Sequence, residues 1–291
     1  MSTTNAVASQ NYARMPATFI CHGGGPLPLL GADPEAAQFL SEYPKSIPTP
    51  SAILVISAHW ITHRVSVTSS KQHPLLFDYS GFPSETYQYT YPAPGSPDLA
   101  SKVCDLLADH NIPCDKDPSR GWDHGVFVPL KIMYPEASIP VVEMSIQTSM
   151  DPLAHIKLGQ ALASLRDEGV LILASGMSFH NFGYFFAKSP TKRAEGLVHS
   201  RAFDKSLVET FTSSPPLSVE NQISSLVNWS QLPSATDCHP LGQEEHLIPL
   251  HVAFGAGLAA GDDAPSHTGA ESANKHFGYG QNFVVSNFEF N

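Results

Sequence analysis

Three widely separated histidines stand where a folded chain could bring them to one point. His22 follows the short apolar run 18–21, His59 follows the apolar run 52–57, and His246 opens an apolar-periodic run. The first two runs predict strands, and the third predicts a helix with His246 on its first turn. Side chains at strand exits point into a common crevice, and imidazole nitrogens are favoured ligands for zinc and iron. The sequence therefore predicts a metal site built from these histidines.

Two further histidines have a similar context. His180 follows the all-apolar run 170–174, and His124 stands beside glycine in the turn-rich stretch 121–125. A buried imidazole without a partner is costly, and a shared metal or hydrogen-bond network removes that cost. His251 lies five positions after His246, about 140° around a helix of ~100° per residue, so the two are not expected to bind one ion.

The elements that must position these histidines alternate between strands and helices. This order predicts a three-layer α/β fold, with a central sheet, mostly parallel or mixed, flanked by helices, and with function at the strand ends. Further strands are expected at 139–146 and 283–288. Helices are expected after the N-caps Asp33 and Asp151, and also at 96–110, 193–211 and 218–229, with a periodic run at 126–133.

The chain is expected to form a single catalytic domain over residues 16–291, preceded by a flexible lead at 1–15. Its 291 residues and 42% hydrophobic content suffice for one large α/β domain. Residues 261–269 are rich in small side chains and predict a loop.

The segment 63–97 combines five prolines with six aromatic residues. Proline at this density excludes a long helix, and the aromatic rings need a surface to pack on. The segment is interpreted either as an ordered excursion that forms a wall of the substrate pocket or as a plain surface loop. Phe82, together with Trp122 further along the chain, is a candidate lining residue for a flat aromatic ring, with core or loop packing as the alternative.

Composition limits the classes of partner. The formal net charge is -11 and the 16 basic residues are scattered, which argues against nucleic acid or an anionic membrane as partner. No window approaches 18 uninterrupted apolar residues, and the N-terminal residues do not have the pattern of a secretory signal. The expected partners are therefore small molecules, and the expected state is a monomer or small homo-oligomer.

The four cysteines lie singly, without a C-x-x-C pair. Cys21, Cys104, Cys114 and Cys238 are expected to be free thiols in a reducing compartment, which predicts a cytoplasmic location. Cys21 and Cys238 each precede a histidine, and both are interpreted as small buried residues or as thiols near the site.

The motifs around the histidines resemble those of class III extradiol ring-cleavage dioxygenases, in the same order. They are HGGGP at 22–26, ISAHW at 56–60, DHG at 123–125, SFHN at 178–181, and HP at 239–240 with EEHLIPLHVAFGA at 244–256. This superfamily includes the catalytic subunit of protocatechuate 4,5-dioxygenase, and the pattern is similar to its single-chain branch of DOPA dioxygenases. The resemblance covers nearly the whole chain, and the five motifs together are much more specific than any one of them.

The resemblance implies a role for each motif histidine. His22, His59 and His246 would be the metal ligands, His180 the acid/base residue, and His124 a donor near the substrate or dioxygen. A histidine side chain ordinarily has a pKa near neutrality, and this residue type is therefore suited to accept and return a proton at position 180.

Two reserve metal ligands follow from the same segment. Glu245 is adjacent to His246, and adjacent residues at a helix start point in different directions. His239 is the other reserve ligand. The family at large is associated with ferrous iron held by two histidines and a carboxylate, whereas this branch is similar to a three-histidine site, and related structures can carry zinc.

The implied reaction joins a small aromatic diol, a catechol, to O2 with opening of the ring beside the hydroxyls. Fe2+ is the implied cofactor, because Zn2+ has no redox change and could not mediate this transfer. A zinc-loaded protein would instead be a hydrolase on the same scaffold, which is the alternative reading. A non-catalytic metal-binding module is a third, although it would not require His124 and His180.

Overall fold

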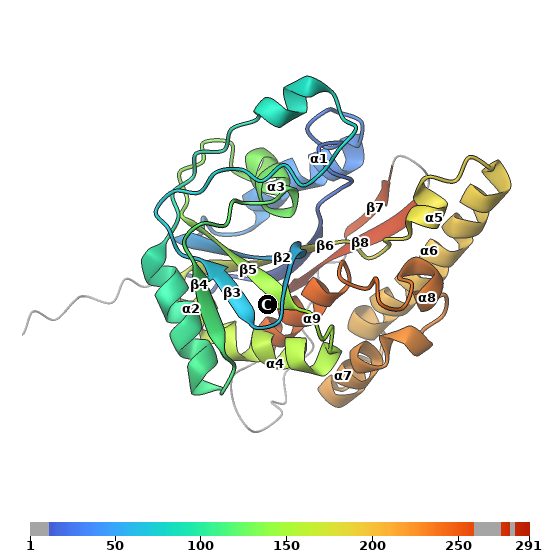
Figure 1. Cartoon of the computed structure of the whole chain (residues 1–291). Helices are drawn as coiled ribbons and strands as arrows, with labels where there is room; N and C mark the ends of the chain where they lie inside the picture. The colour runs from blue at the N-terminus through green and yellow to red at the C-terminus, as the bar shows by residue number, and fades with distance from the viewer. Residues whose placement is uncertain (1–11, 259–274, 280–282) are drawn as a thin grey trace, which may run out of the picture.

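The computed structural model describes residues 12–258, 275–279 and 283–291. Its strands form one mixed sheet in the order β4-β3-β5-β2-β6-β1-β8-β7 (Figure 1). The four central strands run parallel, and their residues are almost all buried, as expected of strands covered on both faces. They are β5 (Val141–Gln147), β2 (Ala52–Thr62), β6 (Val170–Gly176) and β1 (Ala17–Cys21).

The outer strands make the sheet mixed. β3 pairs antiparallel with β5 and parallel with β4, whereas β8 pairs antiparallel with both β1 and β7. Their bounds are β3 (Val65–Thr68), β4 (Cys114–Asp117), β7 (Lys275–Tyr279) and β8 (Phe283–Phe290). The strands predicted at 139–146 and 283–288 are thus confirmed within two residues, whereas β3 was not predicted.

Helices cover both faces of the sheet and complete the three layers that the sequence predicted (Figure 1). On one face α1 (Pro34–Glu42) and α3 (His124–Met133) share a core with β1, β2 and β6. On the other face the core includes α2 (Pro97–Asp109), α4 (Pro152–Leu162), α6 (Pro190–Thr212), α7 (Val219–Val227) and α9 (Ile248–Gly257). The described residues also form two short helices, α5 (Phe182–Phe185) and α8 (Ala235–Cys238), and the 3-10 turns Tyr43–Ser46, Ser84–Gln88, Ala163–Glu168 and Trp229–Gln231.

The predicted helix starts are confirmed by their capping geometry. The Asp33 carboxylate accepts the N–H of Ala36, and the Asp151 carboxylate accepts those of Leu153 and Ala154. Each cap satisfies amides that the first turn of a helix leaves unpaired. No helix in the described ranges is long and apolar enough to span a membrane.

Residues just ahead of β1 are held by the fold. Met15 is buried, its N–H donates to the Arg166 carbonyl, and the Arg166 guanidinium donates to the Met15 carbonyl. This reciprocal pair fixes the chain at Met15, and the division into a lead over 1–15 and a domain over 16–291 stays a prediction. Residues 1–11 and the loop predicted at 261–269 lie outside the described residues.

The prediction of four free thiols is wrong for two of them. Cys104 in α2 and Cys114 at the start of β4 form a disulfide, with their Cα atoms 5.2 Å apart. The chain reverses between this helix and this strand, which brings together two residues that look isolated in sequence. Cys21 and Cys238 are free and buried, which agrees with their interpretation as small buried residues.

Candidate metal centre and active site

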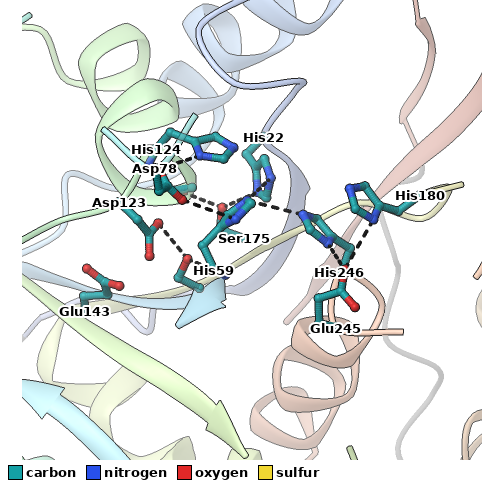
Figure 2. A network of polar contacts seen from close by, with 12 residues as sticks. His22, His59, Asp78, Asp123, His124, Glu143, Ser175, His180, Glu245 and His246 are labelled. Carbon is teal, nitrogen blue, oxygen red and sulfur yellow. Dashed lines mark hydrogen bonds and ion pairs between the residues drawn. The ribbon is translucent and has the colours of Figure 1, made fainter. Parts of the chain in front are cut away.

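Three imidazole rings from distant parts of the chain meet beside the carboxyl ends of the central strands (Figure 2). The Nε2 atom of His59 lies 3.1 Å from Nε2 of His22 and 3.3 Å from Nε2 of His246. His22 and His246 are buried, and His59 is half-buried. The structure therefore brings together the three residues that were predicted from the sequence to be metal ligands.

The ends of the strands position the first two rings. His22 is the first residue after β1, and its N–H donates to the Gly176 carbonyl at the end of β6, 3.1 Å away. β2 continues past His59 rather than ending before it, but its register against β5 shifts between Ser57 and Ile61. Such a bulge re-aims a side chain. The bulge therefore turns the His59 ring toward the site, as the end of β1 does for His22.

The third ring comes from the turn before α9. His246 lies two residues before the first helical residue, Ile248, and not on the first helical turn as predicted. Pro249 explains the later start, because proline is favoured at the beginning of a helix, where its missing N–H costs nothing. The His246 carbonyl accepts the N–H of Met177, and a Cβ at Gly176 would lie 2.2 Å from that carbonyl oxygen. Only glycine therefore allows this approach of the two segments.

Hydrogen bonding on the far side of the His22 ring determines which nitrogen carries its proton. The Ser175 hydroxyl lies 2.8 Å from Nδ1 of His22 and donates its own proton to the Gly125 carbonyl. The hydroxyl oxygen must therefore accept from Nδ1–H. This tautomer leaves a lone pair on Nε2 of His22, directed at the other two rings.

Carboxylates perform the same role for the other two rings. Nδ1 of His246 donates to Oε1 of Glu245 at 2.9 Å, and Nδ1 of His59 lies 3.4 Å from Oδ2 of Asp78. A carboxylate only accepts, so each Nδ1 keeps its proton and each Nε2 presents a lone pair. The Nε2 lone pair of His59 thus faces those of His22 and His246 without a proton between them, and a cation bound there removes the repulsion.

The distances from Nε2 of His59 to the other two Nε2 atoms fit a shared metal ion. Two ligands at about 2.1 Å from one ion are about 3.0 Å apart at a right angle and about 3.4 Å apart at the tetrahedral angle. The observed separations of 3.1 and 3.3 Å fall between these values. Burial, followed by the neighbouring histidines, lowers the pKa of His22 and His246 well below the usual range, and the pKa of His59 falls to about 4. The rings are therefore neutral, which is the form that binds metals.

His124 lies against the same group of rings. Its ring centre is 3.9 Å from that of His59 and 5.4 Å from that of His22, and the nitrogens of these three residues also lie close enough together to hold an ion. The Asp78 carboxylate accepts both the backbone N–H and Nδ1–H of His124, at 3.0 and 2.8 Å. The pKa of Asp78 is lowered, because these histidine contacts outweigh its burial, so the carboxylate stays ionised.

His180 stacks on the outer side of the cluster. Its ring stacks on that of His246, with centres 3.4 Å apart and planes 18° from parallel, and its Nδ1 is 3.4 Å from Oε1 of Glu245 (Figure 2). The exposed ring of Phe182 packs edge-on against it. The His180 N–H donates to the carbonyl of Cys238, which ties this loop to the segment that carries His246. Glu245 therefore contacts a candidate ligand and the candidate acid/base residue at once.

The two reserve ligands occupy supporting positions. Glu245 directs an oxygen at Nδ1 of His246, on the side of the ring opposite Nε2. His239 is fully buried, and its Nε2 lies 3.0 Å from the Ser178 carbonyl in the loop that leads to His180. Burial lowers the pKa of His239 to about 3, so its ring is neutral and donates to that carbonyl.

The two candidate pocket residues lie in different places. Phe82 packs on Tyr79, whose ring is 5.8 Å from that of His124, and a side chain at Gly25 would lie 3.2 Å from the Phe82 ring. Phe82 therefore belongs to an aromatic wall beside the histidines. Trp122 is fully buried in the core that contains α1 and α3, which corresponds to the alternative of core packing.

A buried ionic network behind His59 was not predicted. Asp123 accepts from the Ser57 hydroxyl at 2.8 Å and from Arg120 at 3.0 Å, while Glu143 lies 3.6 Å from Arg120. Burial, together with neighbouring Asp123, raises the pKa of Glu143 well above its usual range. A glutamate within the apolar run of β5 was the available signal, because a buried acid requires partners.

With this geometry established, comparison with known proteins identifies the family. The family described as the catalytic LigB subunit of aromatic ring-opening dioxygenases matches residues 36–287. The chain belongs to this family. The function predicted from the resemblance, metal-dependent extradiol ring cleavage with O2, is thereby confirmed. His22 precedes residues 36–287, which the family matches. Its interpretation as a metal ligand in this LigB-family dioxygenase therefore rests on the geometry above.

Individual relatives agree with the family. The 4,5-DOPA dioxygenase extradiol of Beta vulgaris is 40% identical over 243 residues, which cover 82% of this chain and 86% of that protein. Dioxygenase tasH of Hapsidospora irregularis is 36% identical over 267 residues, covering 86% and 80%. The crystal structure of an uncharacterized protein from Escherichia coli K12 matches with a TM-score of 0.71 and 29% identity, covering 96% and 100%. None of these matches supports the alternative of a hydrolase.

Proposed function

We propose that this dioxygenase opens the ring of a catechol beside its two hydroxyls, with Fe2+ held by His22, His59 and His246. The observation that carries the proposal is that Nε2 of His59 lies 3.1 Å from Nε2 of His22 and 3.3 Å from Nε2 of His246, while Nδ1 of each ring faces a different partner. A ferrous ion, when bound, supplies open coordination positions and a redox change, which ring opening by O2 requires and Zn2+ lacks.

His180 is the proposed acid/base residue. Its Nδ1 faces the Glu245 carboxylate at 3.4 Å, so its Nε2 is the nitrogen that accepts a proton from a substrate hydroxyl and later returns it. Glu245 stabilises the imidazolium that forms, as a carboxylate does wherever it orients a catalytic histidine. The stack on His246 holds this ring against the metal ligands.

His124 and the aromatic wall are proposed to hold the substrate. With Nδ1–H bound to Asp78, the neutral ring of His124 offers Nε2 as an acceptor, and the protonated ring offers it as a donor. Tyr79 packs beside His124, and Phe82 packs on Tyr79. Aromatic side chains favour a flat ring as ligand, because offset and edge-on contacts between rings are favourable.

The proposed substrate is DOPA or a catechol similar to it. The relatives of this chain include 4,5-DOPA dioxygenases extradiol from Beta vulgaris and Mirabilis jalapa, at 40% and 37% identity. By analogy, cleavage at the 4,5 position is the first regiochemistry to test.

The experiment measures O2 uptake after anaerobic loading of the apoprotein with Fe2+. We expect one O2 consumed for each DOPA opened, and no uptake with hydroquinone, whose hydroxyls are not adjacent. Protein loaded with Zn2+ is the matched control and should consume no O2. Substrate turnover by the zinc form without O2 would instead favour a hydrolase, and an iron form inert toward every catechol in a panel would refute the proposal.

A further inference from the structure

Asp78 lies in the proline- and aromatic-rich segment 63–97, outside the sheet. Its neighbours in sequence, Phe77 and Tyr79, pack their rings on Phe127 of α3, with centres 5.6 and 6.3 Å apart. The Asp78 side chain is only 19% exposed. The segment is therefore docked on α3 from both sides of this aspartate, and the carboxylate points inward.

The Asp78 carboxylate reaches two histidines with its two oxygens. Oδ1 accepts from both the backbone N–H and Nδ1–H of His124, at 3.0 and 2.8 Å, and Oδ2 lies 3.4 Å from Nδ1 of His59 (Figure 2). No sequence motif indicates this role. Asp78 lies in the segment 63–97, which the sequence analysis interpreted as a wall of the substrate pocket or as a surface loop.

Asp78 also caps a helix that its own N-cap residue leaves uncapped. Asp123 precedes α3, but its side chain makes no capping bond, because its oxygens accept from Ser57 and Arg120. The first N–H of the helix, at His124, is satisfied instead by Asp78, 46 residues earlier in the chain. A capping carboxylate at a helix N-terminus is further stabilised by the helix dipole. One side chain thus ties the segment, the helix and a candidate metal ligand together.

We infer that Asp78 is a positioning residue that orients His59 and His124 together and couples the docking of its own segment to metal binding. The inference rests on the proposed metal centre. Glu245 provides a parallel, because it contacts His246 and His180 in the same way. Outer carboxylates of this kind typically change metal affinity or activity by about 10–100-fold when removed. Coupling is reciprocal, so a metal that needs Asp78 must in turn stabilise the segment that carries it.

The test uses the full-length apoprotein and Zn2+ as a redox-inert probe. Zinc affinity is measured by competition with a chromophoric chelator, and hydrogen exchange of residues 74–91 is measured with and without zinc. For Asp78→Asn we expect zinc affinity about 10–100-fold weaker than in the wild type. We also expect zinc to slow hydrogen exchange of residues 74–91 in the wild type but not in Asp78→Asn. A merely structural role for Asp78 would change stability without removing that zinc-dependent protection.

Two further variants make the result specific. Glu85→Gln removes one negative charge from the same segment at an exposed position, and should behave as the wild type in both measurements. Asp78→Ser retains an oxygen that can cap α3 but cannot span to His59, and decides the question if the asparagine variant fails to fold. Wild-type zinc affinity and wild-type protection in a folded Asp78 variant would overturn the inference. Full zinc binding by His59→Ala would instead overturn the metal centre itself, so the two failures are distinguishable.

Discussion

The substitution Glu245→Gln separates two roles for the carboxylate beside His246. In the structure Oε1 of Glu245 lies 2.9 Å from Nδ1 of His246 and 3.4 Å from Nδ1 of His180. The pKa of Glu245 is lowered, because its histidine contacts outweigh the opposing effect of burial, so the group is ionised. Glutamine keeps the shape and one acceptor oxygen but removes the charge.

The size of the effect follows from the difference between charged and neutral hydrogen bonds. A bond to a charged group contributes about 1.5–3 kcal/mol and a neutral one about 0.5–1.5 kcal/mol. The side chain of Glu245 is 21% exposed, which favours the lower end, a loss of roughly 1 kcal/mol from the imidazolium of His180. That corresponds to a decrease in kcat of about fivefold at saturating metal and substrate.

The assay compares iron affinity and kcat in the same preparation. We expect Glu245→Gln to bind Fe2+ about tenfold more weakly, because the orientation of His246 is less well fixed, and to show the reduced kcat once iron is saturating. Glu244→Gln is the matched control. Its Oε2 is buried without a hydrogen-bond partner, so the same change one residue earlier should leave kcat unchanged. Wild-type kcat and iron affinity in Glu245→Gln would refute the orienting role, whereas complete loss of metal would make Glu245 a direct ligand.

Three other predictions concern His180, the metal and the buried His251. His180→Ala should retain the metal but lose about 10²–10⁴-fold in turnover, and metal analysis with steady-state kinetics checks both halves. Removal of iron with a chelator should abolish O2 uptake, and Fe2+ but not Zn2+ should restore it; recovery with zinc would contradict the redox role. The fold keeps buried His251 neutral, with a pKa lowered by burial to about 4, whereas the unfolded chain takes up a proton below about pH 6.5. The stability that this ring contributes is therefore lost as the pH falls from about 6.5 to 4, by about 2 kcal/mol between pH 7 and pH 5. Urea denaturation should show a smaller difference in the free energy of unfolding between pH 7 and pH 5 in His251→Gln than in the wild type. An equal difference in the two proteins would contradict the lowered pKa of His251.

Local patterns in the sequence were sufficient to predict the three layers of the fold and the close approach of His22, His59 and His246. Apolar runs bounded by turn residues placed β1, β2 and β6, and histidines at or near their ends lie together because parallel strands end at one edge of a sheet. The bulge at His59 was not predictable, because an irregularity in register depends on the partner strand β5 and leaves no local signal.

The supporting groups were harder to predict because their partners are remote. Asp78 lies 46 residues from His124, and Ser175 lies 153 residues from His22. Neither residue type is unusual where it stands. The same limit applied to Cys104 and Cys114, which looked like isolated thiols until the reversal of the chain paired them.

The proposed function requires one ferrous ion held by Nε2 of His22, His59 and His246. Crystals of the iron-loaded protein, grown without O2 and measured at the iron absorption edge, test it most directly. We expect a single anomalous peak about 2.1 Å from each of these three nitrogens, with Glu245 and Asp78 contacting only the Nδ1 side of His246 and His59. A peak bound by His124 in place of His246, or a peak elsewhere in the protein, would contradict it.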